Sequence, residues 1–260
     1  MRSVDHRSPL ASVACELRAL GVLLAIVALS VGRIASAQPS IAGTWVPAAE
    51  LAVGWHTRNL EMTAAGHTAF ESFDPVRHDS VRFCMPYGTP RNTLKTTDYP
   101  VQILQRSEQI TMIFDGRGDV RRIYTDGRAH PPDPVANWMG HSIGAWRDET
   151  LRVDTVAMTS QSRLDTSGLP HSEAMRVQET WRLVDRAGET LLHVSMTIED
   201  SETYVGTLEA ERYFRRAPLA RMSEASAYCQ MDQWRSYLEH HSKALSLELR
   251  EPAAGREDAP

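Results

Sequence analysis

The side chains best suited to chemistry are concentrated in one stretch of the sequence, from Arg122 to Thr155. This stretch holds two histidines, four aspartates and a serine, Ser142, that stands between Gly140 and Gly144. Burying such groups without partners costs several kcal/mol each, so a packed core avoids them and a functional site collects them. The sequence therefore predicts a site here, with an imidazole as the proton carrier because imidazole titrates near neutral pH.

Alternate positions in the first part of this stretch fall on one face if the segment is an extended strand. That face would hold two guanidinium groups, a phenol, a carboxylate and an imidazole, from Arg122, Tyr124, Asp126, Arg128 and His130. The opposite face would hold Arg121, Ile123 and Thr125. In a barrel lumen the polar face would be a binding and acid–base surface, and on an exterior it would be a ladder of surface ion pairs.

A catalytic version of this site assigns a role to each polar group. We expect His141 or His130 to act as general acid or base, oriented by Asp126 or Asp154. Arg122 and Arg128 would hold an anionic or enolate-like oxygen, and Tyr124 would donate a hydrogen bond to it. Candidates for further substrate contact are Trp146, His171 and Glu173.

Such a set of groups suits isomerisation, elimination, cyclisation or hydrolysis of a small carbonyl-bearing or phenolic molecule. No dinucleotide or nucleotide-phosphate fingerprint occurs in the sequence, so we expect no organic cofactor. The remaining histidines lack metal-ligand spacing, and we expect no metal. In the alternative, a small-ligand-binding protein, the same donors would hold a carboxylate and no step would be catalysed.

A second alternative comes from Gly140-His141-Ser142-Ile143-Gly144, which matches the G-x-S-x-G pattern of serine hydrolases. In those enzymes the serine lies on a tight turn between a strand and a helix. Here the segment Pro131-Pro132-Asp133-Pro134 precedes the motif and a strand-like run follows it. We therefore favour a glycine-rich loop, and keep Ser142 as a nucleophile only as the second alternative.

Strand-like runs dominate the sequence, and turn residues separate them. They cover Ile41–Val46, Val101–Gln105, Gln109–Phe114, Val120–Thr125, Thr150–Ala157, Met175–Val184, Thr190–Ile198 and Glu209–Arg215. Helical periodicity appears in Asn59–Phe73 and in Ser223–Leu247. The pattern predicts a mainly β protein with a single antiparallel barrel of about eight strands, an N-terminal helical segment and a C-terminal helix, with a β-sandwich as the rival fold.

The N-terminus is typical of a secretory signal peptide over residues 1–37. Arginines precede an apolar run from Leu20 to Val31, and Ala35-Ser36-Ala37 provides an A-x-A cleavage site. We expect the product to be exported, either to the periplasm or to the medium. The barrel domain with its C-terminal helix should then cover residues 38–250, and a charged tail, 251–260, should be disordered.

Net charge limits the class of partner. Removing the four arginines and two acidic residues of the leader from the 28 basic and 33 acidic residues leaves a net charge of −7. This balance argues against nucleic acid, which needs clustered Lys and Arg, and no later segment approaches the ~20 apolar residues of a membrane span. A small organic molecule is the expected partner. Cys84 and Cys229 remain after cleavage and are expected to form one disulfide in an oxidising compartment.

Two resemblances accompany these patterns. The triplet Gly43-Thr44-Trp45 resembles the first-strand signature of lipocalin-like (calycin) barrels, which implies a closed barrel that binds one small ligand. Most of the chain also resembles a family of exported bacterial proteins whose activity is not established. The shared motifs are R-x-I-Y-x-D-G-R-x-H-P at Arg122–Pro131, G-H-S-I-G-x-W at Gly140–Trp146, T-L-x-V-D-T at Thr150–Thr155, H-S-E at His171–Glu173, and C-x-P-x-G-x-P beginning at Cys84. This resemblance implies the location of the site and no reaction.

Overall fold

The computed structural model describes residues 39–51, 60–94, 99–116 and 119–222, with four positions beyond them. The expected leader and the tail lie outside the described residues, as does the expected C-terminal helix apart from those four positions. Within the described part, nine strands occur: β1 Gly43–Pro47, β2 Val101–Gln105, β3 Gln109–Phe114, β4 Asp119–Tyr124, β5 His141–Arg147, β6 Thr150–Val156, β7 Arg176–Arg186, β8 Glu189–Glu199 and β9 Thr207–Ala217. The helical elements are short: η1 Ala49–Leu51, α2 Ala64–Glu71, η2 Ser80–Phe83, α3 Arg91–Leu94 and η3 Leu219–Arg221.

The strands form a closed barrel in sequence order, in which β1 pairs with both β2 and β9. This confirms the predicted barrel and excludes the β-sandwich. The prediction of a wholly antiparallel barrel of about eight strands was wrong in two details, because there are nine strands and the β4–β5 pair is parallel. The additional strand is β5, which we expected to be a loop because Gly140 precedes it and Gly144 lies within it.

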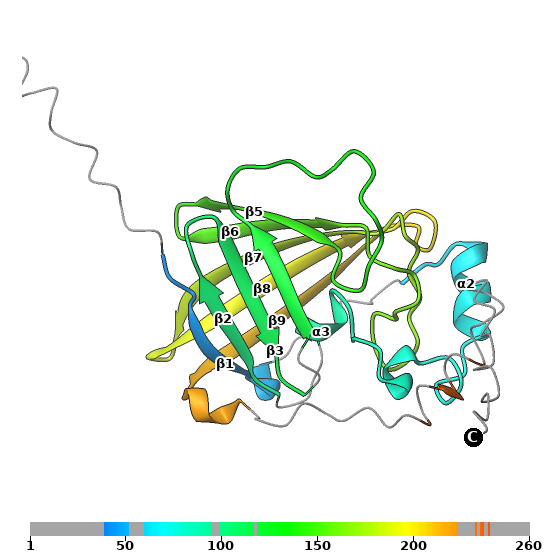
Figure 1. Ribbon diagram of the computed structural model, residues 1–260, viewed down its shortest axis with the longest axis horizontal. Helices are drawn as coiled ribbons and strands as arrows, with labels where there is room; N and C mark the ends of the chain where they lie inside the picture. Colours follow the sequence, from blue (N-terminus) through cyan, green and yellow to red (C-terminus); the bar gives the residue numbers. More distant parts are fainter. Residues whose placement is uncertain are drawn as a thin grey trace, which may run out of the picture. The chain divides into compact units, whose positions relative to one another are not determined.

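A parallel pair cannot be joined by a hairpin, so the chain must cross over between β4 and β5. The connection, residues 125–140, runs outside the barrel, and Figure 1 shows it in green, arching beside β5. Gly140 ends it with φ 68°, and a Cβ there would lie 2.7 Å from the Val156 carbonyl oxygen. Only glycine fits both this backbone conformation and this close approach.

Large side chains fill the interior of the barrel. Trp45 and Trp181 are fully buried, and the Trp45 indole donates a hydrogen bond to the Ile41 carbonyl over 2.9 Å. Leu94 of α3 belongs to the same apolar cluster, and its carbonyl accepts hydrogen bonds from the buried guanidinium of Arg212 at 3.0 and 2.6 Å. The interior is therefore a packed core that α3 extends.

One polar network crosses this core. The fully buried Arg121 of β4 forms a bidentate ion pair with Glu179 of β7, in which Nη1 lies 3.0 Å from Oε1. Its Nε donates to Ser142 Oγ on β5 over 3.2 Å, and its Nη2 donates to Thr155 Oγ1 on β6 over 2.8 Å. The network therefore links four consecutive strands, β4 to β7, and includes the parallel pair.

Removal of one charge from this pair should be costly. We expect Glu179→Gln to lower the free energy of unfolding by about 3–5 kcal/mol, because a buried guanidinium loses its counter-charge. Urea denaturation measures the change, and Glu209→Gln, at an exposed position of β9, serves as the control and should stay within about 0.5 kcal/mol of the wild type. An unchanged unfolding midpoint in Glu179→Gln would contradict the structural role given to the pair.

Candidate functional site

The polar face that the sequence predicted for the lumen points outward. Arg121 and Ile123 of β4 are buried inside the barrel, whereas Arg122 is exposed and Tyr124 is half-buried on the outer wall. The predicted alternation holds only as far as Tyr124, where β4 ends, because Asp126, Arg128 and His130 lie in the connection that follows. The assignment of that face to a polar barrel cavity was wrong. The reason is that Arg121, unlike Arg122, meets hydrogen-bonding partners inside the barrel.

A chain of hydrogen bonds runs over this outer wall. His130, from the 125–140 connection, places its Nδ1 2.8 Å from Nδ1 of His141 at the start of β5. Its Nε2 lies 3.1 Å from Oδ2 of Asp154 on β6. Asp154 in turn accepts two hydrogen bonds of 2.7 Å from Arg176 on β7. Four segments thus build one relay, Arg176–Asp154–His130–His141.

Proton positions follow from the chemistry of the two ends. An ionised carboxylate only accepts, so His130 must donate to Asp154 from Nε2. In neutral His130 the other ring nitrogen, Nδ1, is then an acceptor, and His141 must donate to it from its own Nδ1. Neutral His141 therefore carries a lone pair on Nε2, and this atom makes no hydrogen bond with the residues that the structure describes.

Local electrostatics favour an anionic Asp154 and a neutral His141. Burial by itself would raise the pKa of Asp154, but hydrogen bonds from Arg176 and His130 outweigh it and hold the pKa below its usual value. Burial is the main cause that lowers the pKa of His141; the charge of Arg128, and that of His130 whenever it is protonated, lower it further. His141 is therefore an unprotonated base at neutral pH, and Asp154 is an anion.

Three further members of the predicted face form a chain of contacts that begins at His141. The Tyr124 ring stacks on the His141 ring with centroids 5.5 Å apart, and the Arg128 guanidinium lies 3.9 Å from the Tyr124 ring centroid. Asp126 accepts two hydrogen bonds of 2.9 Å from Nε of Arg128. Of the two aspartates expected to orient a histidine, the structure places Asp154 in that position and pairs Asp126 with Arg128.

A pocket of about 330 Å³ adjoins this cluster. Its polar lining includes Arg122, Tyr124 and His141, and Arg122 makes no ion pair with the described residues. Much of the rest is apolar and comes from β4 and the 125–140 connection: Val120, Pro131, Pro134, Val135 and Met139. The pocket thus combines a base, a cation and an apolar wall, which is the composition of a small-molecule site.

Ser142 lies inside the barrel, away from this pocket. It is 1% exposed, sits in the second position of β5, and hydrogen-bonds to Arg121 and Thr155. The G-x-S-x-G segment is therefore a strand, and neither the glycine-rich loop that we expected nor a strand-to-helix turn is present there. Trp146, on the same side of β5, packs against the barrel core.

The cluster from His171 to Glu173 also lies apart from the relay. His171 is buried, and its Nδ1 donates to the Ser172 carbonyl over 3.0 Å while Nε2 accepts from Ser162 Oγ over 2.7 Å. Burial lowers the pKa of His171, although the Ser172 carbonyl and Asp200 oppose this effect. Glu173 is exposed on the adjoining turn. These residues stabilise a connection between β6 and β7 and do not reach the pocket.

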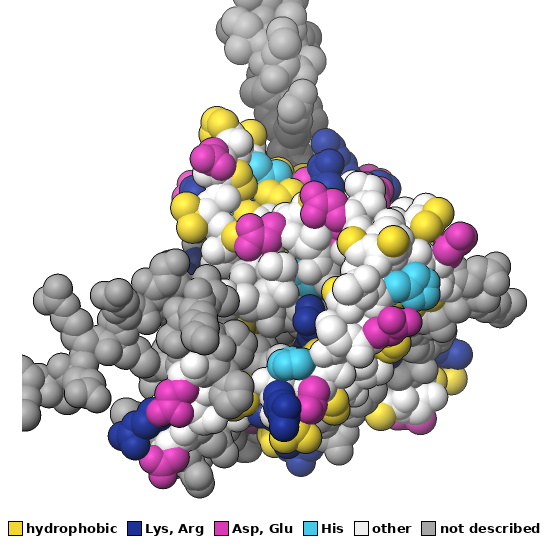
Figure 2. All heavy atoms as spheres, turned by 90° about the vertical axis from the view of Figure 1, so that its right-hand side faces the viewer, with side chains coloured by type: hydrophobic (Ala, Val, Ile, Leu, Met, Phe, Trp, Pro, Cys, Tyr) yellow, Lys and Arg dark blue, Asp and Glu magenta, His cyan; other side chains and the backbone are white. Residues whose placement is uncertain are grey.

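Three further expectations concern the disulfide, metal binding and the membrane, and they can be compared only with the residues that the structure describes. Cys229 lies outside them, so its pairing with Cys84 stays a prediction. Within the described ranges no three His, Cys, Asp or Glu side chains gather as metal ligands, and no helix is long and apolar enough to cross a membrane. On the face drawn in Figure 2, the described acidic, basic and histidine side chains are interspersed.

Sequence reasoning missed Arg176 as a member of the site. The available signal was its position directly after the apolar Met175, at the start of a strand. Met175 is buried, and residues on either side of a buried position face outward. No protein-family model matches this sequence, and no curated protein matches it either. The function is therefore inferred from the geometry of the site.

The lowered pKa values of His141 and His171 make stability depend on pH. Below about pH 6.5 the unfolded chain protonates these histidines while the native state keeps them neutral, so the unfolded state binds more protons and the free energy of unfolding falls on acidification. We expect a lower urea midpoint at about pH 5.5 than at about pH 7.5.

Two variants test the origin of this dependence. His171→Asn should weaken the pH dependence of the urea midpoint, because one of the groups whose pKa is lowered is gone. The same change at His67, an exposed residue of α2, should leave the dependence as it is in the wild type. A midpoint that rises toward about pH 5.5 would contradict the assigned neutral states.

Proposed function

We propose that this protein is an acid–base enzyme that acts on a small organic molecule bound beside His141. The observation that carries the proposal is the relay from Asp154 through His130 to His141, which leaves the lone pair of His141 Nε2 available. An unprotonated imidazole in a partly apolar pocket is suited to general base catalysis near neutral pH.

The relay provides a route for the abstracted proton. His141 Nε2 takes a proton from a carbon or oxygen of the substrate, and the proton on its Nδ1 can pass to Nδ1 of His130. The imidazolium formed on His130 then lies against the carboxylate of Asp154, which Arg176 holds in place. Arg122 lines the same pocket and is placed to balance the negative charge that develops on a substrate oxygen.

The pocket lining supports a substrate with an apolar body and one carbonyl or phenolic oxygen. Isomerisation, elimination, cyclisation and hydrolysis all begin with the proton transfer that this geometry provides. The signal peptide expected at residues 1–37 supports action outside the cytoplasm, on molecules that reach the periplasm or the medium.

A non-catalytic ligand-binding protein is the alternative. The sequential strand order supports a lipocalin-like barrel, but the parallel β4–β5 pair departs from the antiparallel pattern of such barrels. The tryptophans inside the barrel argue against a ligand held in the lumen. A binder would use the outer pocket with Arg122 as its anion contact, and would have no use for the ordered tautomers of His130 and His141.

Proton abstraction can be tested with a generic probe, 5-nitrobenzisoxazole, whose ring opens after loss of one carbon-bound proton. We expect the wild-type protein to accelerate this reaction over buffer, and His141→Ala to lower the rate at least about 100-fold, because the base is lost. The rate of the wild type should rise with pH and level off near neutrality, since the pKa of His141 lies below its ordinary value.

Two further variants complete this test. Asp154→Asn should lower the rate while the fold is retained, because the amide no longer fixes the His130 tautomer, and His67→Ala should have no effect. A wild-type rate equal to that of buffer would favour the binding alternative. A rate unchanged in folded His141→Ala would reject His141 as the base.

The serine hydrolase alternative is tested by covalent labelling. We expect a fluorophosphonate probe to leave Ser142 unlabelled in the folded protein, because its hydroxyl is buried and hydrogen-bonded to Arg121 and Thr155. Mass spectrometry of the Ser142 peptide measures this. A phosphonate adduct on Ser142 that is lost in Ser142→Ala would restore the hydrolase alternative.

A further inference from the structure

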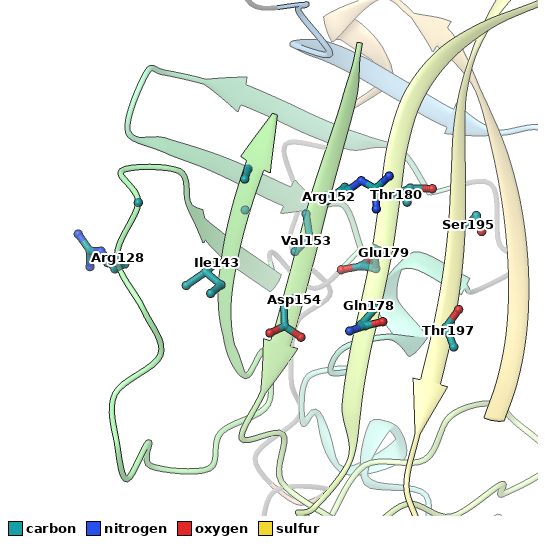
Figure 3. A pocket seen from close by; sticks show the side chains of 13 residues that line it. Arg128, Ile143, Arg152, Val153, Asp154, Gln178, Glu179, Thr180, Ser195 and Thr197 are labelled. Carbon is teal, nitrogen blue, oxygen red and sulfur yellow. The ribbon is translucent and has the colours of Figure 1, made fainter. Parts of the chain in front are cut away.

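A second hollow, of about 460 Å³, lies on the outer face of β5 to β8. Figure 3 shows its side chains in rows across the strands. The strand register creates one row from Asp154, Gln178 and Thr197, and a second row from Arg152, Thr180 and Ser195. The 125–140 connection forms one wall through Arg128. We call this hollow the outer groove.

The polar side chains of the outer groove have unused hydrogen-bonding capacity. Five of them make no hydrogen bond or ion pair with the residues that the structure describes: Arg152, Gln178, Thr180, Ser195 and Thr197. Each hydroxyl and the amide can both donate and accept. Because three of the five, Thr180, Ser195 and Thr197, are only half-exposed, a ligand that both donates and accepts would satisfy them better than an apolar one.

The charges that border the outer groove are balanced. Arg128 is paired with Asp126, and Asp154 is paired with Arg176. Arg152, which has no ion-pair partner among the described residues, begins a row that ends on β9 at Glu211, the register partner of Ser195. Glu211 lies outside the lining of the groove, and its carboxylate is 3.5 Å from Nε2 of His193. With a cation near one end and a carboxylate beyond the other, the row has no excess charge that would favour a strongly charged ligand.

Apolar surface completes the lining. Ile143 and Ala145 of β5 lie next to Asp154 and Arg152 in the register, on the side toward Arg128. This part of the groove can accept the carbon-bound hydrogens of a ring, while the rows farther along accept its hydroxyl groups. Adjacent strands are about 4.8 Å apart, so the hydroxyls of the register partners Thr180 and Ser195 have a spacing close to the width of a sugar ring.

We infer that the outer groove binds a neutral, polyhydroxylated ligand, and that an oligosaccharide is the chemical class that fits it. Sugar hydroxyls donate and accept as the groove side chains do, and the flat faces of sugar rings are apolar. The inference is independent of the proposed catalysis, because the groove shares only Asp154 with the relay and does not include His141.

Isothermal titration of the whole protein with maltotriose and with cellotriose tests the inference, and trigalacturonate is the anionic comparator of equal length. We expect saturable binding of at least one neutral trisaccharide and weaker binding of trigalacturonate. Gln178→Ala and Thr197→Val should each weaken the neutral ligand roughly five- to tenfold, because each removes a hydrogen bond.

Two control variants show whether the measured binding depends on the outer groove. Thr207→Val, at an exposed position of β9 outside the groove, should leave the affinity unchanged. His141→Ala should also leave it unchanged, whether or not His141 is a catalytic base.

Several results would overturn the inference. These are absence of saturable binding by both neutral trisaccharides, tighter binding of trigalacturonate, or an affinity unaffected by both Gln178→Ala and Thr197→Val. Light scattering that shows a dimer which Thr197→Val dissociates would also overturn it, because the groove would then hold a second copy of the chain.

Discussion

The ion pair between Arg121 and Glu179 is the interaction on which the arrangement of the site depends. It and its hydrogen-bonding partners fix which side of four strands faces inward, with Ser142 on β5 and Thr155 on β6. Side chains alternate along a strand, so each inward residue sets its neighbour outward, and a shift of one residue would reverse every face. Arg122, His141, Asp154 and Gln178 therefore face outward as a consequence of the buried network.

The parallel pairing of β4 with β5 adds the second requirement. A parallel pair needs a connection that crosses over, and here the connection passes outside the barrel and carries His130 to its place between His141 and Asp154. A hairpin at this point would have made β5 antiparallel and would have left no segment to supply His130. The glycine at position 140, with its left-handed backbone, returns the chain into β5 at close contact with Val156.

Much of the fold and part of the site could be predicted from the sequence, because both depend on local patterns. Alternation located eight strands, and the density of titratable groups pointed to His130, His141 and Asp154, of which His130 lies within hydrogen-bonding distance of the other two. The inside of β4 could not be predicted, since Arg121 and Arg122 are both arginines and the partners that bury Arg121 lie far along the chain. Contacts between distant residues also bury Ser142 and bring Arg176 into the site. From the sequence alone Ser142 therefore resembled a nucleophile, and Arg176 was missed.

Two polar clusters thus lie back to back across the same barrel wall, and their hydrogen bonding distinguishes them. In the inner cluster Arg121 has a carboxylate and two hydroxyls as partners, and such a group is costly to disturb because water cannot replace a lost partner. In the outer cluster, solvent reaches the ion pairs, which contribute little to stability. The lone pair of His141 Nε2 can therefore remain available without endangering the fold. Because side chains alternate along a strand, the two faces of one wall can differ. The inner polar groups have all their hydrogen-bonding partners and hold the register, whereas the outer groups keep hydrogen-bonding capacity that is available for proton transfer.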